Sequence, residues 1–184
     1  MRSKVFFING GAGRVVASIP ALEKYAETHD DFIIVCEGGM NFYRGHPVLH
    51  KYAYDNWHKG LFEDKIKDRD CITPEPYRQW HYYNQKCSLS QAFDIEINGL
   101  DEPRELPAPN ITLAKGEGIQ GMQLVDEAIN TTGKEKVIVI QPFGRGIMDT
   151  GGYMFDPTSR SFNLSDISTI INNLKKDYCV IVMS

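Results

Sequence analysis

Glycine and arginine residues are concentrated in two stretches that follow short apolar runs and precede helical patterns. The first stretch, NGGAGR, contains Gly10, Gly11, Gly13 and Arg14. A glycine-rich turn between a strand and a helix lets backbone approach a ligand and points free helix N–H groups at it. Such a ligand is usually a phosphate, which an arginine binds through paired hydrogen bonds. The stretch indicates an anion site; a tight turn without ligand and a solvated Arg14 are the alternatives.

The second stretch is the long loop QPFGRGIMDTGGYMFDPTSRS. Its candidate phosphate-binding residues are Gly144, Arg145, Arg160 and Ser161. The loop follows an apolar run, and ligands in open α/β sheets collect at the edge where strands end. Because it is also longer than a plain connection needs to be, we predict a second anion site here. The alternative is a flexible surface loop whose arginines are solvated.

The elements that must position these stretches alternate between strand and helix. Apolar runs at 4–8 and 32–36 predict buried strands, and a helical pattern at 14–28 lies between them, interrupted by Pro20. Buried strands separated by a helix imply a parallel βαβ unit. Further strands are predicted at 52–54, 70–73, 137–140 and 178–183, and further helices at 89–97, 118–132 and 165–176. The fold class is therefore α/β with a parallel, Rossmann-like sheet.

A proline-rich segment divides the chain. The sequence DEPRELPAPN at 101–110 has three prolines in ten residues, which is typical of a linker. We expect an N-terminal domain at 1–100, a linker at 101–115, and the start of a second domain at 116–184. We expect this second domain to be incomplete in the chain, which would leave apolar surface for a partner chain to cover.

Composition narrows the class of protein. The chain has 184 residues and a formal net charge of −4, which gives no general attraction to nucleic acids or anionic membranes. No apolar run approaches the roughly 20 residues of a membrane span, and no export signal opens the chain, so we expect a cytoplasmic protein. The four cysteines lack metal or redox spacing, and Pro47 separates His46 from His50, so we expect no metal cofactor.

Aromatic residues are dense at 76–85, where Tyr77, Trp80, Tyr82 and Tyr83 stand with Arg78 and His81. Aromatic rings stack on sugars and nucleobases, and arginine adds a contact to phosphate. The alternative is that these rings pack a helix against the sheet.

Two parts of the chain resemble the family 9 glycosyltransferases of the GT-B fold, the heptosyltransferase-like enzymes. The opening KVFFINGGAGRVVASIPALEKY is similar to the family's strand, glycine loop and proline-containing helix, with Gly10 and Gly13 at the glycine positions. The stretch VIVIQPFGRG resembles the start of the family's C-terminal domain. Arg160, followed by Phe162, falls where the family carries a donor-binding lysine. The stretch ITPEPYR is also similar to glycosyltransferase-like proteins of tailed phages.

The resemblance implies transfer of a sugar from a nucleotide-sugar donor to an acceptor, which the sequence leaves open as a glycan or a modified nucleic acid. It implies two Rossmann-like domains, with Arg145 and Arg160 on the donor diphosphate and no metal or other cofactor. The family's loop aspartate, its general base, is replaced by Arg14, and arginine does not accept a proton. Glu37 and Glu75 follow predicted strands and are the candidate bases, with plain surface carboxylates as the alternative.

Two other classes of function remain open at the level of sequence. The replacement of the loop aspartate also fits a non-catalytic module, or an inactive GT-B fragment, that binds a nucleotide or sugar phosphate. An NAD-dependent oxidoreductase is the third reading, because Glu37 after the second strand is placed to accept ribose hydroxyls.

Overall fold

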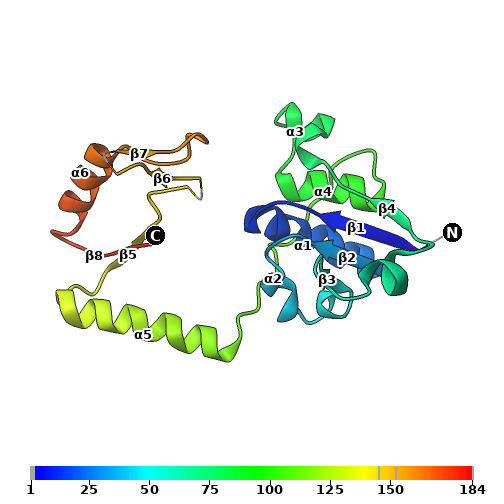
Figure 1. Cartoon of the computed structure of the whole chain (residues 1–184), viewed down its shortest axis with the longest axis horizontal. Helices are drawn as coiled ribbons and strands as arrows, with labels where there is room; N and C mark the ends of the chain where they lie inside the picture. The colour runs from blue at the N-terminus through cyan, green and yellow to red at the C-terminus, as the bar shows by residue number, and fades with distance from the viewer. Residues whose placement is uncertain (1–2, 145, 152, 184) are drawn as a thin grey trace. The chain divides into compact units, whose positions relative to one another are not determined.

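The computed structural model describes residues 3–144, 146–151 and 153–183. The chain forms two compact units, residues 1–114 and 115–184 (Figure 1). Each unit is described by itself below. Among the described residues, no helix combines the length and the apolar character that a membrane crossing requires.

A four-stranded parallel sheet forms the centre of the first unit. Its strands are β1 (Lys4–Ile8), β2 (Phe32–Cys36), β3 (Ala53–Asp55) and β4 (Asp70–Ile72), in the order β3-β2-β1-β4. Strands β1 and β2 pair along their whole length, from Lys4 with Phe32 to Ile8 with Cys36. The prediction of a parallel, Rossmann-like sheet is confirmed, because all three strand pairs are parallel.

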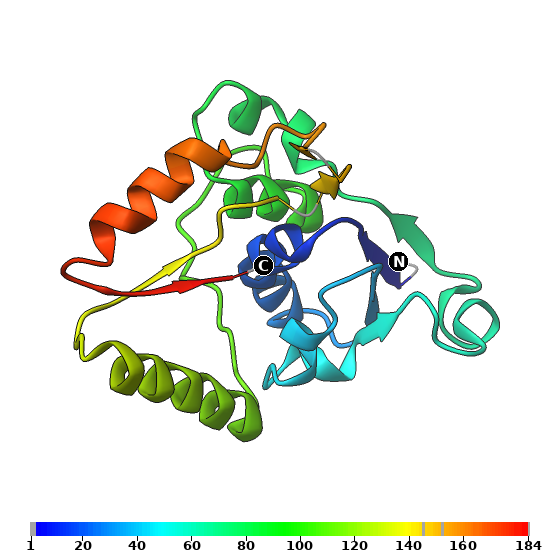
Figure 2. The ribbon, with the colours of Figure 1, turned by 60° about the vertical axis from the view of Figure 1, so that its left-hand side comes forward.

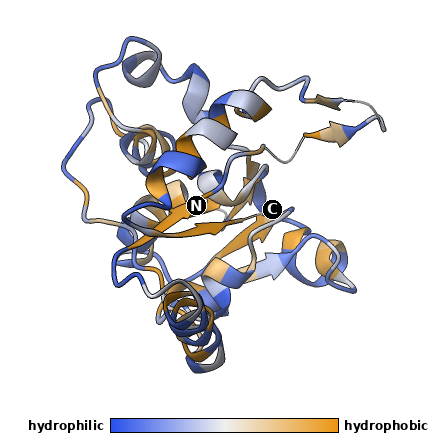
Figure 3. Cartoon of the chain, turned by 90° about the vertical axis from the view of Figure 1, so that its left-hand side faces the viewer, coloured by the Kyte–Doolittle hydropathy of each residue, from blue (hydrophilic) through white to orange (hydrophobic). Residues whose placement is uncertain are grey.

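Two helices cover one face of this sheet. Helix α1 (Ala12–Ala26) joins β1 to β2, and α4 (Leu89–Asn98) packs beside it over the same core. Alternate residues of the strands point into this core, which includes Phe6 and Ile8. The other face buries the smaller cluster of Val5, Ile33, Val35 and Leu61. Several strands are correspondingly drawn in the orange of apolar residues in Figure 3.

Short elements complete the first unit. They are α2 (Asn41–Arg44), η1 (Leu49–Lys51), η2 (Phe62–Ile66), η3 (Pro76–Arg78) and α3 (Trp80–Tyr83). None of the three between β2 and β4 was predicted, since three to five residues are too few to show a helical period. The predicted helix at 14–28 is displaced in the structure, because its first turn already includes Ala12 and Gly13.

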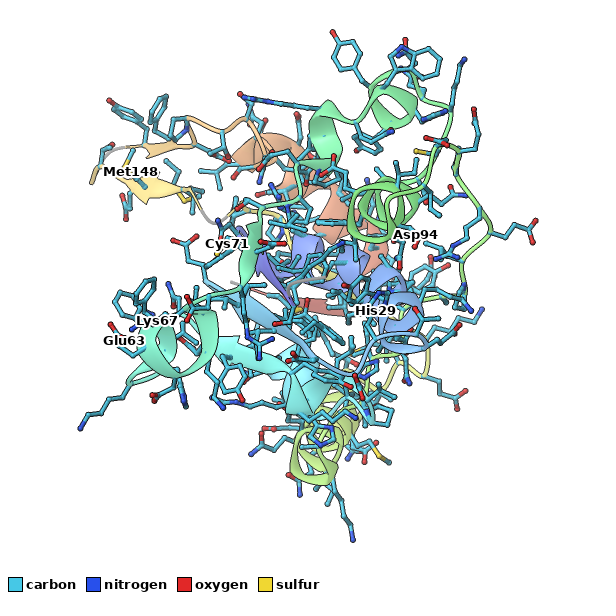
Figure 4. The ribbon with its side chains drawn as sticks, turned by 90° about the vertical axis from the view of Figure 1, so that its right-hand side faces the viewer. His29, Glu63, Lys67, Cys71, Asp94 and Met148 are labelled. Atoms are coloured by element: carbon cyan, nitrogen blue, oxygen red, sulfur yellow. The ribbon has the colours of Figure 1, made fainter. Side chains whose placement is uncertain are left out.

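An ion pair between a buried carboxylate and a partly exposed arginine holds the proline-rich segment against α4. Arg104 donates to both oxygens of Asp94, from Nε to Oδ2 at 2.6 Å and from Nη2 to Oδ1 at 2.8 Å. Asp94, labelled on α4 in Figure 4, is fully buried, and its hydrogen bonds raise the pKa of Arg104 above its usual value. The amide of Gln91 also donates to the carbonyl of Arg104 at 2.8 Å. Residues 101–114 therefore belong to the first unit by their contacts.

The second unit is built on one parallel pair of strands. Its elements are α5 (Lys115–Thr132), β5 (Val137–Ile140), β6 (Met148–Asp149), β7 (Met154–Phe155), α6 (Leu164–Leu174) and β8 (Cys179–Val182). Strands β5 and β8 run side by side and are linked by the long loop and α6 (Figure 2). The antiparallel pair β6–β7 was not predicted, because each strand has only two residues.

Candidate functional site

Three loops meet at the carboxyl edge of the four-stranded sheet. Residues 9–11 follow β1, residues 37–39 follow β2, and residues 73–75 follow β4. The first two loops touch, because a Cβ atom built on Gly38 would lie 3.7 Å from the carbonyl oxygen of Gly10. This is the edge where parallel sheets bind ligands.

The glycine loop leaves its backbone open. Gly10 has a φ of +108°, which side-chain-bearing residues rarely adopt, so the backbone favours glycine at this position; a Cβ atom there would also lie 2.9 Å from Cδ of Arg14. Gly11 caps α1 without a side-chain hydrogen bond, and no acidic residue lies in the first turn of the helix. Cβ atoms on Gly11 and Gly13 would meet nothing within 4 Å, so this helix start is accessible to a ligand.

Arg14 folds back from α1 onto the loop after β4. Its Nη2 donates to the carbonyl oxygen of Pro74 at 2.7 Å, and Nη1 and Nη2 lie 3.5 and 3.4 Å from Oε1 of Glu75. Its guanidinium carbon lies 5.4 Å from the ring centre of Tyr77 and 5.7 Å from that of Phe93. With its side chain only 15% exposed, Arg14 is not the solvated surface residue that one alternative described.

A second carboxylate supports this ion pair. The backbone N–H of Glu75 donates to Oε2 of Glu96 at 2.5 Å. Burial raises the pKa of Glu96 above its usual value and the charge of Glu75 adds to the rise, whereas the hydrogen bond and the charge of Arg14 oppose it. Arg14 is therefore the cation between two carboxylates, and an incoming anion has to compete with Glu75 for it.

The two predicted bases differ in their surroundings. Glu75 accepts hydrogen bonds from Arg14, and its side chain is 48% exposed. Glu37 directly follows β2, is exposed, and has no hydrogen bond or ion pair with any residue that the structure describes. The structure thus joins Glu75 to Arg14 and leaves Glu37 outside that pair.

The second unit contains a pocket of about 450 Å³ between the β6–β7 hairpin and the start of α6. This volume lies within the range of small-molecule sites. The lining combines apolar and polar side chains: Phe143, Ile147, Tyr153, Met154, Asp156, Ser159, Ser161, Phe162, Asn163 and Leu164. The pocket is formed by the loop that the sequence singled out.

Asp156 organises this loop. Its Oδ2 accepts from the hydroxyl of Ser161 at 2.6 Å and from the N–H of Arg160 at 3.0 Å, and its Oδ1 accepts from the N–H and hydroxyl of Thr158. The hydrogen bonds from Ser161 and Thr158 lower the pKa of Asp156 to about 2. The carboxylate therefore stays ionised inside the pocket at neutral pH.

The predicted residues of this loop have separate roles in the structure. The hydroxyl of Ser161 accepts a hydrogen bond from the N–H of Gly144 at 2.9 Å and donates one to Asp156, so it links two distant parts of the loop. A Cβ atom on Gly144 would lie 2.9 Å from Cβ of Arg160, which explains the glycine. The guanidinium of Arg160 has no hydrogen bond or ion pair within the described part of the chain. Arg145 lies outside the described residues.

The acid titration of this loop tests the network. We expect the amide resonances of Thr158 and Arg160 to shift with a midpoint near pH 2, because Asp156 titrates there and not near 3.8. The folded-state pKa is lowered, so the stabilisation by this carboxylate is present above about pH 4 and is lost as the pH falls through about 2. In Asp156→Asn the transition should be absent. A midpoint near 4 in NMR spectra of the wild type would contradict the network.

The histidine pair considered for metal binding has a structural role. His46 is fully buried; its Nδ1 accepts from the N–H groups of Val48 and Leu49, and its Nε2 lies 3.0 Å from Oε1 of Glu23. Within residues 3–144, 146–151 and 153–183, no group of three potential metal ligands comes together.

Three residues at these sites were not found from the sequence. They are Phe93, Glu96 and Asp156. The first two lie in a pattern typical of a helix, and their proximity to Arg14 depends on the packing of α4 against α1. The sequence FDPTS contains a signal for Asp156, because an aspartate followed by proline and threonine favours a side-chain-capped turn.

Comparison with models of protein families, with characterised proteins and with solved structures returns no significant match for this chain.

Proposed function

We propose that the chain is a GT-B-type glycosyltransferase that moves a sugar from a nucleotide-sugar to an acceptor. The observation that carries the proposal is that both units contain the same succession of strand, loop and helix. In each unit a buried or half-buried parallel strand runs into a loop with glycine and arginine, and that loop leads toward a helix. Two Rossmann-like units, one for each substrate, are what the sequence resemblance implies.

In this proposal the pocket of the second unit binds the donor. Phe162 and Tyr153 line it and are exposed, so their rings can contact a nucleobase. Arg160, whose guanidinium has no partner within the described residues, is assigned to the diphosphate together with Arg145. The charge of Asp156 repels phosphate, so the diphosphate is assigned to the neighbourhood of Arg160, which lies in the chain between the lining residues Ser159 and Ser161.

The sheet edge of the first unit would bind the acceptor. The open backbone at Gly11 and Gly13 leaves room for it beside Arg14. A base must take the proton of the acceptor hydroxyl, and Glu37 and Glu75 are the carboxylates placed at this edge. Oε1 of Glu75 is already engaged by Arg14, whereas Glu37 has no partner among the described residues, so Glu37 is the better candidate.

The experiment measures the nucleoside diphosphate that is released when the chain is mixed with nucleotide-sugars and acceptor extracts. Arg160→Ala should weaken apparent donor affinity about tenfold, because it removes a charge-assisted hydrogen bond. Glu37→Gln should lower turnover about a hundredfold with little change in donor affinity. Lys175→Ala removes an exposed charge at the end of α6 and is the matched control. Equal activity in Arg160→Ala and Lys175→Ala would refute the donor assignment.

One observation favours a second candidate, a non-catalytic module that binds a nucleotide or sugar phosphate. By the sequence resemblance, Arg14 stands where the family 9 glycosyltransferases carry their base, and arginine, here paired with Glu75, does not accept a proton. Saturable binding of a nucleotide-sugar without release of nucleoside diphosphate, with every acceptor tested, would favour this candidate.

A further inference from the structure

Residues 76–86 carry aromatic rings on the outside of the first unit. The side chains of Tyr77, Trp80 and Tyr83 are 46%, 56% and 77% exposed. Packing against the sheet, the alternative considered for this segment, therefore does not account for these three rings. We call Tyr77, Trp80 and Tyr83, with Arg78 and Lys86, the aromatic surface.

Hydrogen bonds hold the backbone beneath the aromatic surface. The side chain of Gln79 caps α3 by accepting from the N–H groups of His81 and Tyr82 at 2.6 and 3.3 Å. At the other end, Asn84 donates from its side chain to the carbonyl of Trp80 at 2.8 Å. The exposed rings thus stand on a fixed turn, which lowers the entropic cost of binding through them.

The two formally charged side chains within residues 76–86, Arg78 and Lys86, are both positive. Nζ of Lys86 lies 4.1 Å from the ring centre of Trp80, and Arg78 is exposed. No acidic residue occurs between Pro76 and Lys86 in the sequence. Two acidic residues adjoin the segment: Glu102 lies 3.1 Å from Nε2 of His81, and Glu75, which is paired with Arg14, directly precedes Pro76. Cations interleaved with aromatic rings complement a polymer whose backbone is negatively charged and whose flat groups are free to stack on the rings.

We propose that the aromatic surface binds single-stranded nucleic acid. Unpaired bases stack on Trp80 and Tyr83, and the phosphates between them contact Arg78 and Lys86. Base pairs of a duplex offer no free faces, so the surface discriminates against double strands. A neutral glycan would use the rings but not the two cations. This proposal does not depend on the glycosyltransferase proposal, although Tyr77, 5.4 Å from the guanidinium carbon of Arg14, connects the surface to the sheet edge.

Fluorescence of Trp80 provides the direct test. The chain has two tryptophans, and the other one, Trp57, is 84% exposed on a different loop. In a Trp57→Phe background, an oligothymidylate of about 16 nucleotides should quench the emission of Trp80 saturably. A duplex of the same length and a neutral maltooligosaccharide should not. Quenching by the sugar alone would overturn the proposal in favour of a glycan, and equal quenching by the duplex would reduce it to general charge attraction.

Anisotropy of a labelled oligothymidylate then tests the individual residues in the full chain. Trp80→Ala should weaken binding about 5- to 100-fold, and Trp80→Phe should restore most of it. Lys86→Ala and Arg78→Ala should each reduce the slope of log affinity against log salt by about 0.7. Trp57→Ala, which removes a more exposed tryptophan ring elsewhere in the first unit, should bind as the wild type does. Unchanged binding in Trp80→Ala, with a native circular dichroism spectrum, would overturn the proposal, as would no binding by the wild type.

Discussion

Replacing Phe93 with alanine is expected to lower the free energy of unfolding of the first unit by about 4 kcal/mol. Phe93 is fully buried on α4 and packs in the core with residues of α1, β1 and β2. Removing its ring leaves a cavity that the rigid sheet cannot fill. The same ring lies 5.7 Å from the guanidinium carbon of Arg14, so its loss also removes one wall of the candidate site.

Chemical denaturation followed by tryptophan fluorescence measures this effect, because both tryptophans, Trp57 and Trp80, belong to the first unit. Phe93→Leu is the matched control, since it retains most of the volume and should cost less than about 1.5 kcal/mol. Equal stability of the leucine and alanine variants would mean that Phe93 does not fill the core as described.

Replacing Arg104 with alanine is expected to cost about 3 kcal/mol of the same free energy, because it leaves a charged carboxylate buried without a cation. Asp94 is fully buried and would keep only the amide of Asn98, which donates to Oδ1 at 2.7 Å. The value lies at the lower end of the range for broken buried pairs. The side chain of Arg104 is 42% exposed, so water can enter where it leaves.

Adding the substitution Asp94→Asn separates the effect of an unpaired buried charge from the effect of losing the Arg104 contacts. In the double variant Arg104→Ala with Asp94→Asn, the buried group is neutral, and we expect more than half of the lost stability to return. Protease cleavage within 101–114 should be faster in Arg104→Ala than in the wild type, because the pair holds this segment on α4. If the double variant is no more stable than Arg104→Ala, the burial of an unpaired charge is not the cause.

The strands could be predicted because their signal is local. The runs KVFFI, FIIVC and VIVI are apolar, rich in β-branched or aromatic residues and bounded by polar or glycine residues, and all three are strands with the predicted bounds. The alternation of strands and helices along the chain then implied that the strands pair in parallel. The hairpin at β6 and β7 has two residues per strand, which is too short for any period to appear.

The site could be predicted only in part, because its contacts join distant residues. Placing Arg14 and Glu75 at the same edge of the sheet followed from their positions after predicted parallel strands, but their ion pair spans 61 positions and depends on the path of the loop after β4. The segment DEPRELPAPN has the composition of a linker, and the buried partner of Arg104 lies inside an amphipathic helix pattern. Composition cannot show such a pair.

The most direct test of the central proposal is a thermal-shift screen of the full chain against UDP-, GDP-, ADP- and CMP-sugars, with NAD and ATP as controls. We expect one class of nucleotide-sugar to stabilise the protein, by about 2.7 kcal/mol at a hundred times its dissociation constant. Arg160→Ala should reduce that shift, and Lys175→Ala should leave it unchanged. A folded sample that responds to none of the nucleotide-sugars, or to NAD alone, would contradict the account.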